Sequence, residues 1–258
     1  IPDDASVTSL SYFQDDPNRL VNLQLPNFVS SVYHLPDRLL DLLEIAAYVF
    51  AADRWAQRGP KDALEFHAWA RSMNFVIRVR DAEFWNRQAV SAKLSAALLF
   101  MTGDLQYDFL FISGHSTPQS DLFDREAFEI ETRGPVSVVL FSGGLDSLAG
   151  VLKRLDTTDE DIYLISHRSG LPSTKRTQKG LVDALKSDYP GRVHHYSFEC
   201  GLSHKRGTEE TQRTRAFLFN SIAFTLAYRL SQKEFFAYEN GITSLNLIRR
   251  QDLISARA

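Results

Sequence analysis

The residues best suited to chemistry in this chain lie together at positions 142–147, with the sequence S-G-G-L-D-S. The two glycines permit a tight turn and leave no Cβ in the way of a ligand. The serines add hydroxyl donors, and the main-chain N–H groups of the turn can form a nest around a phosphate. The expected phosphate ligands are Ser142, Gly143, Gly144, Leu145 and Ser147. Asp146 would orient the loop or help to hold Mg²⁺.

The segments on either side of this loop predict a strand before it and a helix after it. Residues 136–141 are almost continuously apolar and rich in valine, as in a central parallel strand. Apolar residues then recur at helical spacing at Leu148, Val151, Leu152 and Leu155. A loop in this position meets a helix N-terminus, where unpaired N–H groups and the helix dipole favour an anion. The alternative is a strand–turn–helix corner whose glycines serve geometry alone.

Basic residues at the start of a second predicted helix, residues 214–230, are candidate phosphate clamps. Arg213 and Arg215 oppose the helix dipole there, so we expect an anion to compensate for them. A triphosphate would do so, and a salt bridge to Glu209 or Glu210 is the alternative. Lys205, in the polar loop before this helix, is a weaker candidate.

Alternating strands and helices predict a parallel sheet in the second half of the chain. Strands are expected at 136–141, 161–166, 192–199 and 233–238, with helices at 175–186 and 214–230. Ligands bind at the carboxyl ends of the strands in such sheets. His167 follows one of these strands. We expect it either to lie against a bound nucleotide or to be exposed to water. The last strand is followed by Glu239, Asn240 and Gly241, which we expect to border the nucleotide or nucleobase pocket.

The first half of the chain carries no recognisable chemistry. Alternating patterns predict strands at 20–25, 75–80 and 107–113, and apolar stripes predict a helix from residue 37 and a long helix over 82–101. We expect Arg78 and Arg80 to lie on a solvated strand face, and the tryptophans to be core residues. We therefore predict two domains. Residues 1–134 would form an α+β accessory domain that positions a substrate or partner, and residues 135–258 would form the second domain.

Composition narrows the class of protein. The chain has 258 residues and a formal net charge of −3, which argues against a broad nucleic-acid-binding surface but leaves room for a local basic patch. No apolar run is long enough to span a membrane. The single cysteine, Cys200, allows neither an internal disulfide nor a four-cysteine zinc site, and suits the cytoplasm.

Three motifs together resemble a known family. S-G-G-L-D-S lacks the lysine of a Walker A loop and is similar to the PP-loop of the N-type ATP pyrophosphatases. The later motifs Q-R-T-R-A-F-L-F (212–219) and E-N-G-I-T-S-L-N (239–246) resemble the 7-cyano-7-deazaguanine synthase branch. They are most similar to synthase-like proteins of bacterial anti-phage defence operons, such as the C component of the Qat system.

This resemblance implies a fold, a reaction and a site. The fold would be an adenine nucleotide alpha hydrolase-like parallel sheet with helices on both faces. The reaction would be adenylation of a 7-deazaguanine-type carboxylate by ATP with Mg²⁺, releasing pyrophosphate, followed by transfer to ammonia or a protein amine. The implied catalytic residues are Asp146, Ser147, Lys205, Arg213 and Arg215. A partner from the same operon is also implied, and a nucleotide-binding scaffold without turnover is the alternative.

Two departures from the family stand out. The queuosine-precursor enzymes hold a four-cysteine zinc cluster, whereas this chain has one cysteine, so we expect no structural zinc. The family also continues beyond the E-N-G loop, so we expect either that the chain is truncated at its C-terminus or that the remaining catalytic segments are absent.

Overall fold

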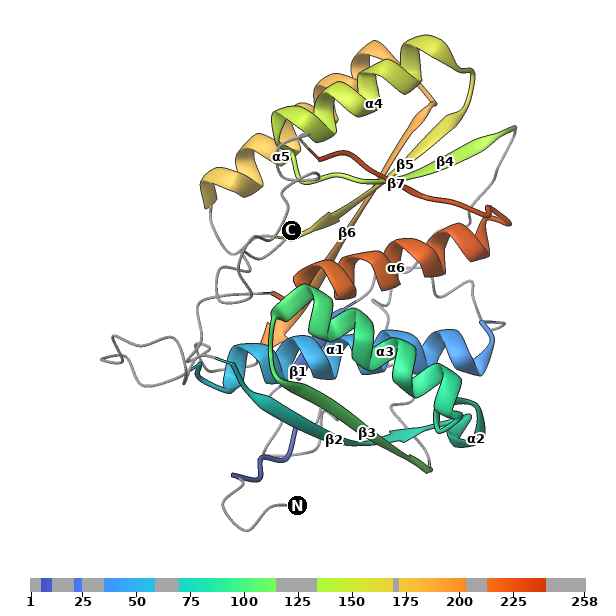
Figure 1. The fold of residues 1–258 in the computed structure, drawn as a ribbon. Coiled ribbons are helices and arrows are strands. Elements are labelled where there is room, and N and C mark those ends of the chain that lie inside the picture. Colours follow the sequence, from blue (N-terminus) through green and yellow to red (C-terminus); the bar gives the residue numbers. More distant parts are fainter. Residues whose placement is uncertain are drawn as a thin grey trace.

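The computed structural model describes residues 6–10, 21–24, 35–58, 70–114, 134–168, 172–202 and 213–239 (Figure 1). Its larger sheet has five strands in the order β1-β6-β5-β4-β7. Four of them are mutually parallel, and β1 pairs with β6 in the antiparallel direction. The strands are β1 (Val21–Gln24), β4 (Val136–Leu140), β5 (Asp161–His167), β6 (Val193–Leu202) and β7 (Phe236–Ala237).

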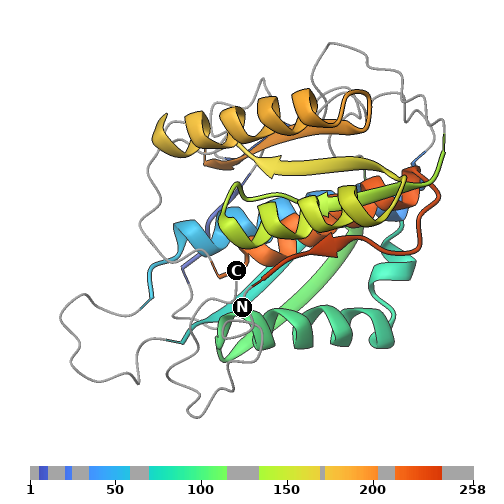
Figure 2. The ribbon, with the colours of Figure 1, turned by 90° about the horizontal axis from the view of Figure 1, so that it is seen from above.

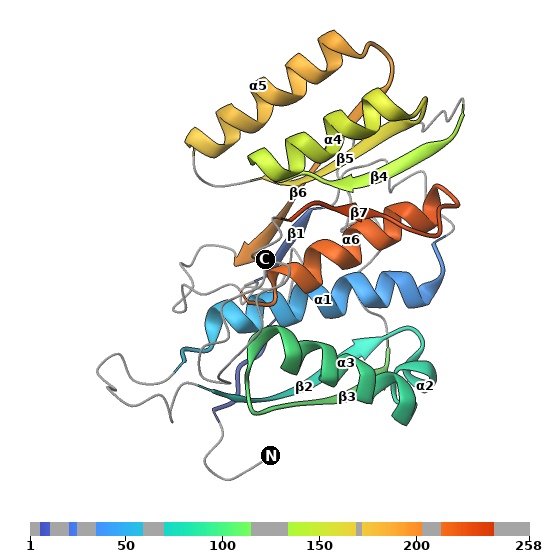
Figure 3. The same ribbon diagram turned by 45° about the horizontal axis from the view of Figure 1, so that its top comes forward.

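Helices cover both faces of this sheet, as Figures 2 and 3 show. On one face, α4 (Leu145–Thr157) and α5 (Pro172–Asp188) pack through Val151 and Val182 onto Val139 and Leu164. On the other face lie α6 (Arg215–Arg229) and α1 (Asp37–Trp55), against the alternate residues of the same strands. The strands are apolar on both sides because both sides are buried. The prediction of a parallel sheet with helices on both faces is confirmed.

The first part of the chain contributes directly to this sheet. Val21 of β1 lies opposite Leu202 of β6, so β1 forms the edge strand. Val21, Leu43 and Phe50 belong to the same hydrophobic cluster as Val138 and Ile222. The core is therefore continuous across residue 134, where the sequence predicts a boundary.

A second layer lies on the far side of α1 (Figure 1). It contains β2 (Ser72–Val79), β3 (Gln106–Ser113), α2 (Ala82–Trp85) and α3 (Gln88–Thr102), and its two strands are parallel. Ile45 and Val49 of α1 pack against Ile77 and Leu98 of this layer. Because α1 has neighbours on two sides, it is buried around most of its surface, and not along a single stripe.

The long helix predicted over residues 82–101 is two helices. Asn86 ends α2, and its side-chain amide donates to the carbonyl oxygen of Phe111 at 2.7 Å and accepts from the Phe111 N–H at 3.1 Å. The backbone leaves the helical conformation at Arg87, whose ψ is 128°, before α3 begins. A local pattern of apolar residues does not reveal it.

The environment of the Arg80 side chain differs from the prediction that it lies on a solvated strand face. Its guanidinium contacts the buried carboxylates of Asp41 at 3.1 Å and Glu44 at 2.8 Å. Asp41 also accepts from Trp85 Nε1 at 3.1 Å, which places Trp85 in the core as expected. Arg78, by contrast, is exposed, as predicted.

Within the described ranges, no helix is long and apolar enough to cross a membrane. In those same ranges, no group of three or more His, Cys, Asp and Glu side chains is placed to hold a metal ion. Cys200 is buried, and its burial raises the pKa of the thiol to about 12.

Candidate functional site

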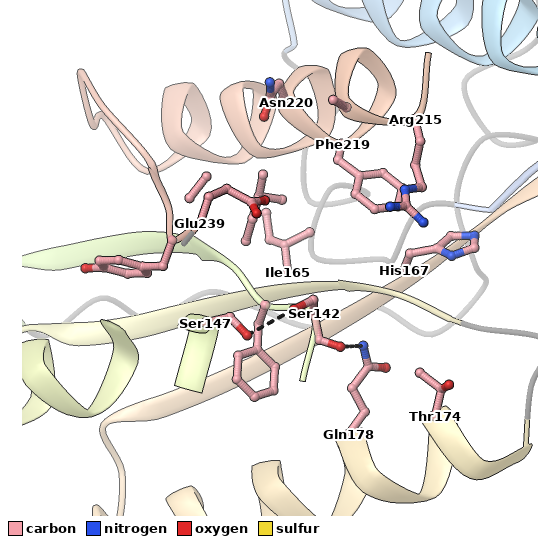
Figure 4. A pocket seen from close by; sticks show the side chains of 15 residues that line it. Ser142, Ser147, Ile165, His167, Thr174, Gln178, Arg215, Phe219, Asn220 and Glu239 are labelled. Atoms are coloured by element: carbon pink, nitrogen blue, oxygen red, sulfur yellow. Dashed lines mark hydrogen bonds between the residues drawn. The ribbon is translucent and has the colours of Figure 1, made fainter. Parts of the chain in front are cut away.

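A pocket of about 420 Å³ opens at the carboxyl edge of the parallel strands (Figure 4). From β4 the chain runs through β5 to β6, and α6 then returns it to β7 on the other side of β4. The direction of winding therefore reverses between β4 and β7. Ligands of open α/β sheets bind in the crevice at such a reversal.

The pocket walls come from segments far apart in the chain. The loop after β4, the ends of β5 and β7, and the helices α5 and α6 all contribute. The lining residues are Leu140, Phe141, Ser142, Ser147, Ile165, His167, Thr174, Gln178, Arg215, Ala216, Phe219, Asn220, Ala237, Tyr238 and Glu239.

The S-G-G-L-D-S loop has the geometry of an anion-binding turn. The hydroxyls of Ser142 and Ser147 lie 3.1 Å apart, and Ser147 also donates to the carbonyl oxygen of Gly144 at 3.0 Å. Gly144 is the N-cap of α4, and no side chain caps that helix, so N–H groups of its first turn stay open to a ligand. Leu145 begins α4 and is 79% exposed.

Gly143 requires the conformation that only glycine adopts easily. Its φ is +80°, and an added Cβ would lie 2.9 Å from Cγ of Gln178. Gln178 in turn donates from Nε2 to the carbonyl oxygen of Ser142 at 3.0 Å (Figure 4). This hydrogen bond fixes the Ser142 carbonyl against α5.

Arg215, Phe219 and His167 form a group at one side of the pocket (Figure 4). The guanidinium carbon of Arg215 is 5.8 Å from the Phe219 ring centroid, and the rings of Phe219 and His167 are 5.4 Å apart. Burial lowers the pKa of His167, and the positive charges of Arg215 and Arg54 add to this effect. His167 is thus a neutral ring at pH 7, suited to stacking and hydrogen bonding.

The position of Arg213 differs from the prediction that both Arg213 and Arg215 hold a phosphate. Its side chain is buried and donates from Nη1 to the carbonyl oxygen of Thr102 at 3.2 Å. It does not line the pocket, whereas Arg215 does. Arg213 lies before the N-cap Thr214, whereas Arg215 is the first residue of α6, so the two side chains are not carried by the same helix.

A carboxylate of the protein itself supplies the negative charge that was expected at the start of α6. Asp53 of α1 accepts hydrogen bonds from the N–H and the hydroxyl of Thr214, at 3.0 and 3.1 Å. Nothing at the sequence level links these residues, which are 161 positions apart. The alternative partners Glu209 and Glu210 lie outside the described residues.

Two carboxylates near the loop fit a Mg²⁺ ion carried by a nucleotide. Glu239 lines the pocket, and its pKa is raised by burial and by the neighbouring charge of Asp146, while Arg215 opposes the change. Asp146 is exposed in the first turn of α4. Mg²⁺ in nucleotide sites usually takes one or two carboxylates together with phosphate oxygens and water. These two side chains would supply that share.

Some of the residues singled out in the sequence line the pocket, and other lining residues were not singled out. The pocket brings together Ser142, Ser147, His167, Arg215 and Glu239. Lys205, Asn240 and Gly241 lie outside the described residues.

The missed residues are mainly on helices. Thr174 and Gln178 lie four apart on one face of α5, and Phe219 and Asn220 follow Arg215 by one turn of α6. Gly150 is also significant, because a Cβ there would lie 2.2 Å from the Tyr238 ring. A glycine inside the predicted helix was the available signal for this close approach.

Comparisons of the chain with protein-family models, curated proteins and solved structures find no match. The site must therefore be interpreted from its own geometry and from the motifs.

Proposed function

We propose that the protein binds ATP at the loop of residues 142–147 and uses it to adenylate a 7-deazaguanine-type carboxylate, in bacterial anti-phage defence. One observation carries the proposal: the glycine loop before α4, a helix start without a side-chain cap, lines the same pocket as Arg215 at the reversal point of the sheet. The motif resemblance supplies the substrate class. A pocket of about 420 Å³ is within the range that small-molecule ligands occupy.

In the proposed reaction a carboxylate oxygen of the substrate attacks the α-phosphorus of ATP. The bond between that phosphorus and the oxygen bridging to the β-phosphorus breaks, and pyrophosphate takes the electron pair. The loop N–H groups and Arg215 would hold the charge that develops on the pyrophosphate. Bound Mg²⁺ would neutralise part of the same charge, with Asp146 and Glu239 as its protein ligands.

The acyl adenylate then transfers its acyl group to an amine. A free carboxylate is a poor acyl donor because oxide would have to leave, whereas the adenylate releases AMP. Ammonia would give an amide, and a protein amine would attach the base to a partner. The neutral ring of His167 lies at the pocket wall, where it is able to accept a proton from the attacking amine.

The proposal is tested by determining which bond of ATP is cleaved. ATP labelled at the α or γ position is incubated with the protein, Mg²⁺ and a 7-carboxy-7-deazaguanine substrate, and the products are separated by thin-layer chromatography. We expect labelled AMP or acyl adenylate from the α label and pyrophosphate from the γ label. ADP and orthophosphate as the main products would contradict it.

A second candidate is a nucleotide-binding subunit without turnover. The buried position of Arg213 favours it, because only one of the two arginines of the motif reaches the pocket. Asp146→Ala separates the candidates, since Asp146 is exposed and its loss removes little packing. A folded variant that still protects cells from phage would favour the scaffold, and loss of both protection and pyrophosphate release would favour the enzyme.

A further inference from the structure

A buried ionic cluster lies between the β2–β3 layer and the start of α6. It consists of Asp53, Arg58, Arg71 and Asp104, whose side chains are at most 8% exposed. Asp104 accepts from Arg58 Nη1 at 2.6 Å and from Arg71 Nη2 at 2.9 Å. Two positive and two negative charges balance, which offsets the cost of removing them from water.

Asp53 of this cluster also contacts Thr214, the N-cap residue of α6. Its Oδ1 accepts from Arg58 Nη2 at 2.9 Å and from Arg71. Its Oδ2 accepts from the N–H of Thr214 at 3.0 Å and from the Thr214 hydroxyl at 3.1 Å. Thr214 is the N-cap of α6 but makes no cap hydrogen bond to its own helix. Asp53 therefore brings the negative charge that the helix dipole favours at this end.

The next residue after Thr214 is Arg215, whose side chain lines the pocket. Because Thr214 is held at two atoms, the place where α6 begins, and with it the base of the Arg215 side chain, depends on Asp53. We propose that Asp53, acting through Thr214, is a positioning residue that sets how strongly Arg215 holds a phosphate. The identity of the ligand rests on the proposed function, whereas the ordering of the helix start does not.

The hydroxyl of Thr214 gives the mildest test. Thr214→Val keeps the branched shape and removes one of the two donors to Asp53, while Thr214→Ser keeps both. Titration calorimetry with a non-hydrolysable ATP analogue and Mg²⁺ measures affinity for the intact chain. We expect about ten-fold weaker binding for Thr214→Val, as for the loss of one hydrogen bond to a charged group, and near wild-type binding for Thr214→Ser.

Asp104 provides a matched control for Asp53. Asp53→Asn and Asp104→Asn each remove one buried carboxylate charge from the same cluster, so both should lower the melting temperature. Only Asp53→Asn should weaken analogue binding, measured well below both melting temperatures. Equal affinity losses in the two variants would overturn a positioning role, because general destabilisation would then explain both.

A double-mutant cycle tests whether the effect passes through Arg215. In an Arg215→Met background, Thr214→Val should produce no further loss of affinity. A full further loss would overturn the proposal.

Amide hydrogen exchange of residues 214–220 without nucleotide separates this proposal from the proposed function. Faster exchange in Thr214→Val and Asp53→Asn, but not in Asp104→Asn, supports positioning even if the wild-type protein binds no ATP. Unchanged exchange in both variants overturns it. Absence of analogue binding by the wild-type chain counts against the proposed function alone.

Discussion

The side-chain amide of Gln178, on α5, donates to the main-chain carbonyl of Ser142 at 3.0 Å and packs against Gly143. This contact joins the candidate phosphate loop to a helix that follows it by about thirty residues in the sequence. It also occupies the carbonyl oxygen with a donor, which lowers the repulsion that a free oxygen would exert on a nearby phosphate. The loop is therefore shaped by a side chain outside its own motif.

Replacing Gln178 should weaken nucleotide binding. Gln178→Met keeps the length of the side chain and removes its donor, so the Ser142 carbonyl becomes free to turn. We expect about ten-fold weaker binding of an ATP analogue and a loss of about 1 kcal/mol in the free energy of unfolding. Lys179→Ala, on the exposed side of α5, is the control and should change neither quantity. Unaltered binding in Gln178→Met would show that the loop holds its shape without this contact.

The two glycines of the loop should differ in their tolerance of alanine. Gly143→Ala places a Cβ at a φ of +80° and 2.9 Å from Gln178, and should cost about 1–2 kcal/mol of unfolding free energy. Gly144 has a φ of −86°, and its nearest neighbour would be Ser142 Oγ at 3.4 Å. Gly144→Ala should cost less than about 1 kcal/mol. Urea denaturation measures both, and equal costs would argue against the conformation described for Gly143.

Substitutions of the two arginines at the start of α6 should have different effects, one on nucleotide binding and the other on stability. Arg215→Met should weaken analogue binding about ten-fold or more, since charge-assisted bonds to phosphate are strong, with little change in unfolding free energy. Arg213→Met should lower the unfolding free energy by about 1–3 kcal/mol, because a buried donor to Thr102 is lost. Calorimetric titrations and urea melts of both variants provide the measurement. A greater loss of binding in Arg213→Met would restore the pair of clamps that the motif predicts.

The stability of the fold should fall as the pH falls from about 6.5 to about 4. Burial lowers the pKa of His195 to about 4, with smaller contributions from Lys186 and Arg168, and its Nε2 lies 3.0 Å from Ser166 Oγ. An unfolded histidine titrates near pH 6.5, so in this window the unfolded chain binds more protons and acid favours unfolding.

The expected contribution of His195 is on the order of 3 kcal/mol, present in full above about pH 6.5. His195→Gln removes the titrating group, so its unfolding free energy should depend less steeply on pH. Part of the slope should remain, because burial also lowers the pKa values of His167 and His194. An identical slope in wild type and variant would contradict the assignment to His195.

Local patterns were enough to predict the loop and the elements around it. A valine-rich strand, two glycines and a helical repeat are set by near neighbours, and β4, the loop and α4 match them. The parallel sheet followed from the alternation of strands and helices, and His167 and Glu239 could be placed at its edge because parallel strands end on one side.

Only the tertiary structure decided which side chains meet at that edge and what holds them. Arg213 and Arg215 look equivalent in the sequence, yet one is buried against Thr102 and the other lines the pocket, because Arg213 precedes the helix whereas Arg215 is its first residue. Asp53 meets Thr214 across 161 residues, and β1 joins β6 from the opposite half of the chain. Such contacts arise when separate segments bury their apolar faces together. They depend on the packing of whole elements, which no short stretch of sequence specifies.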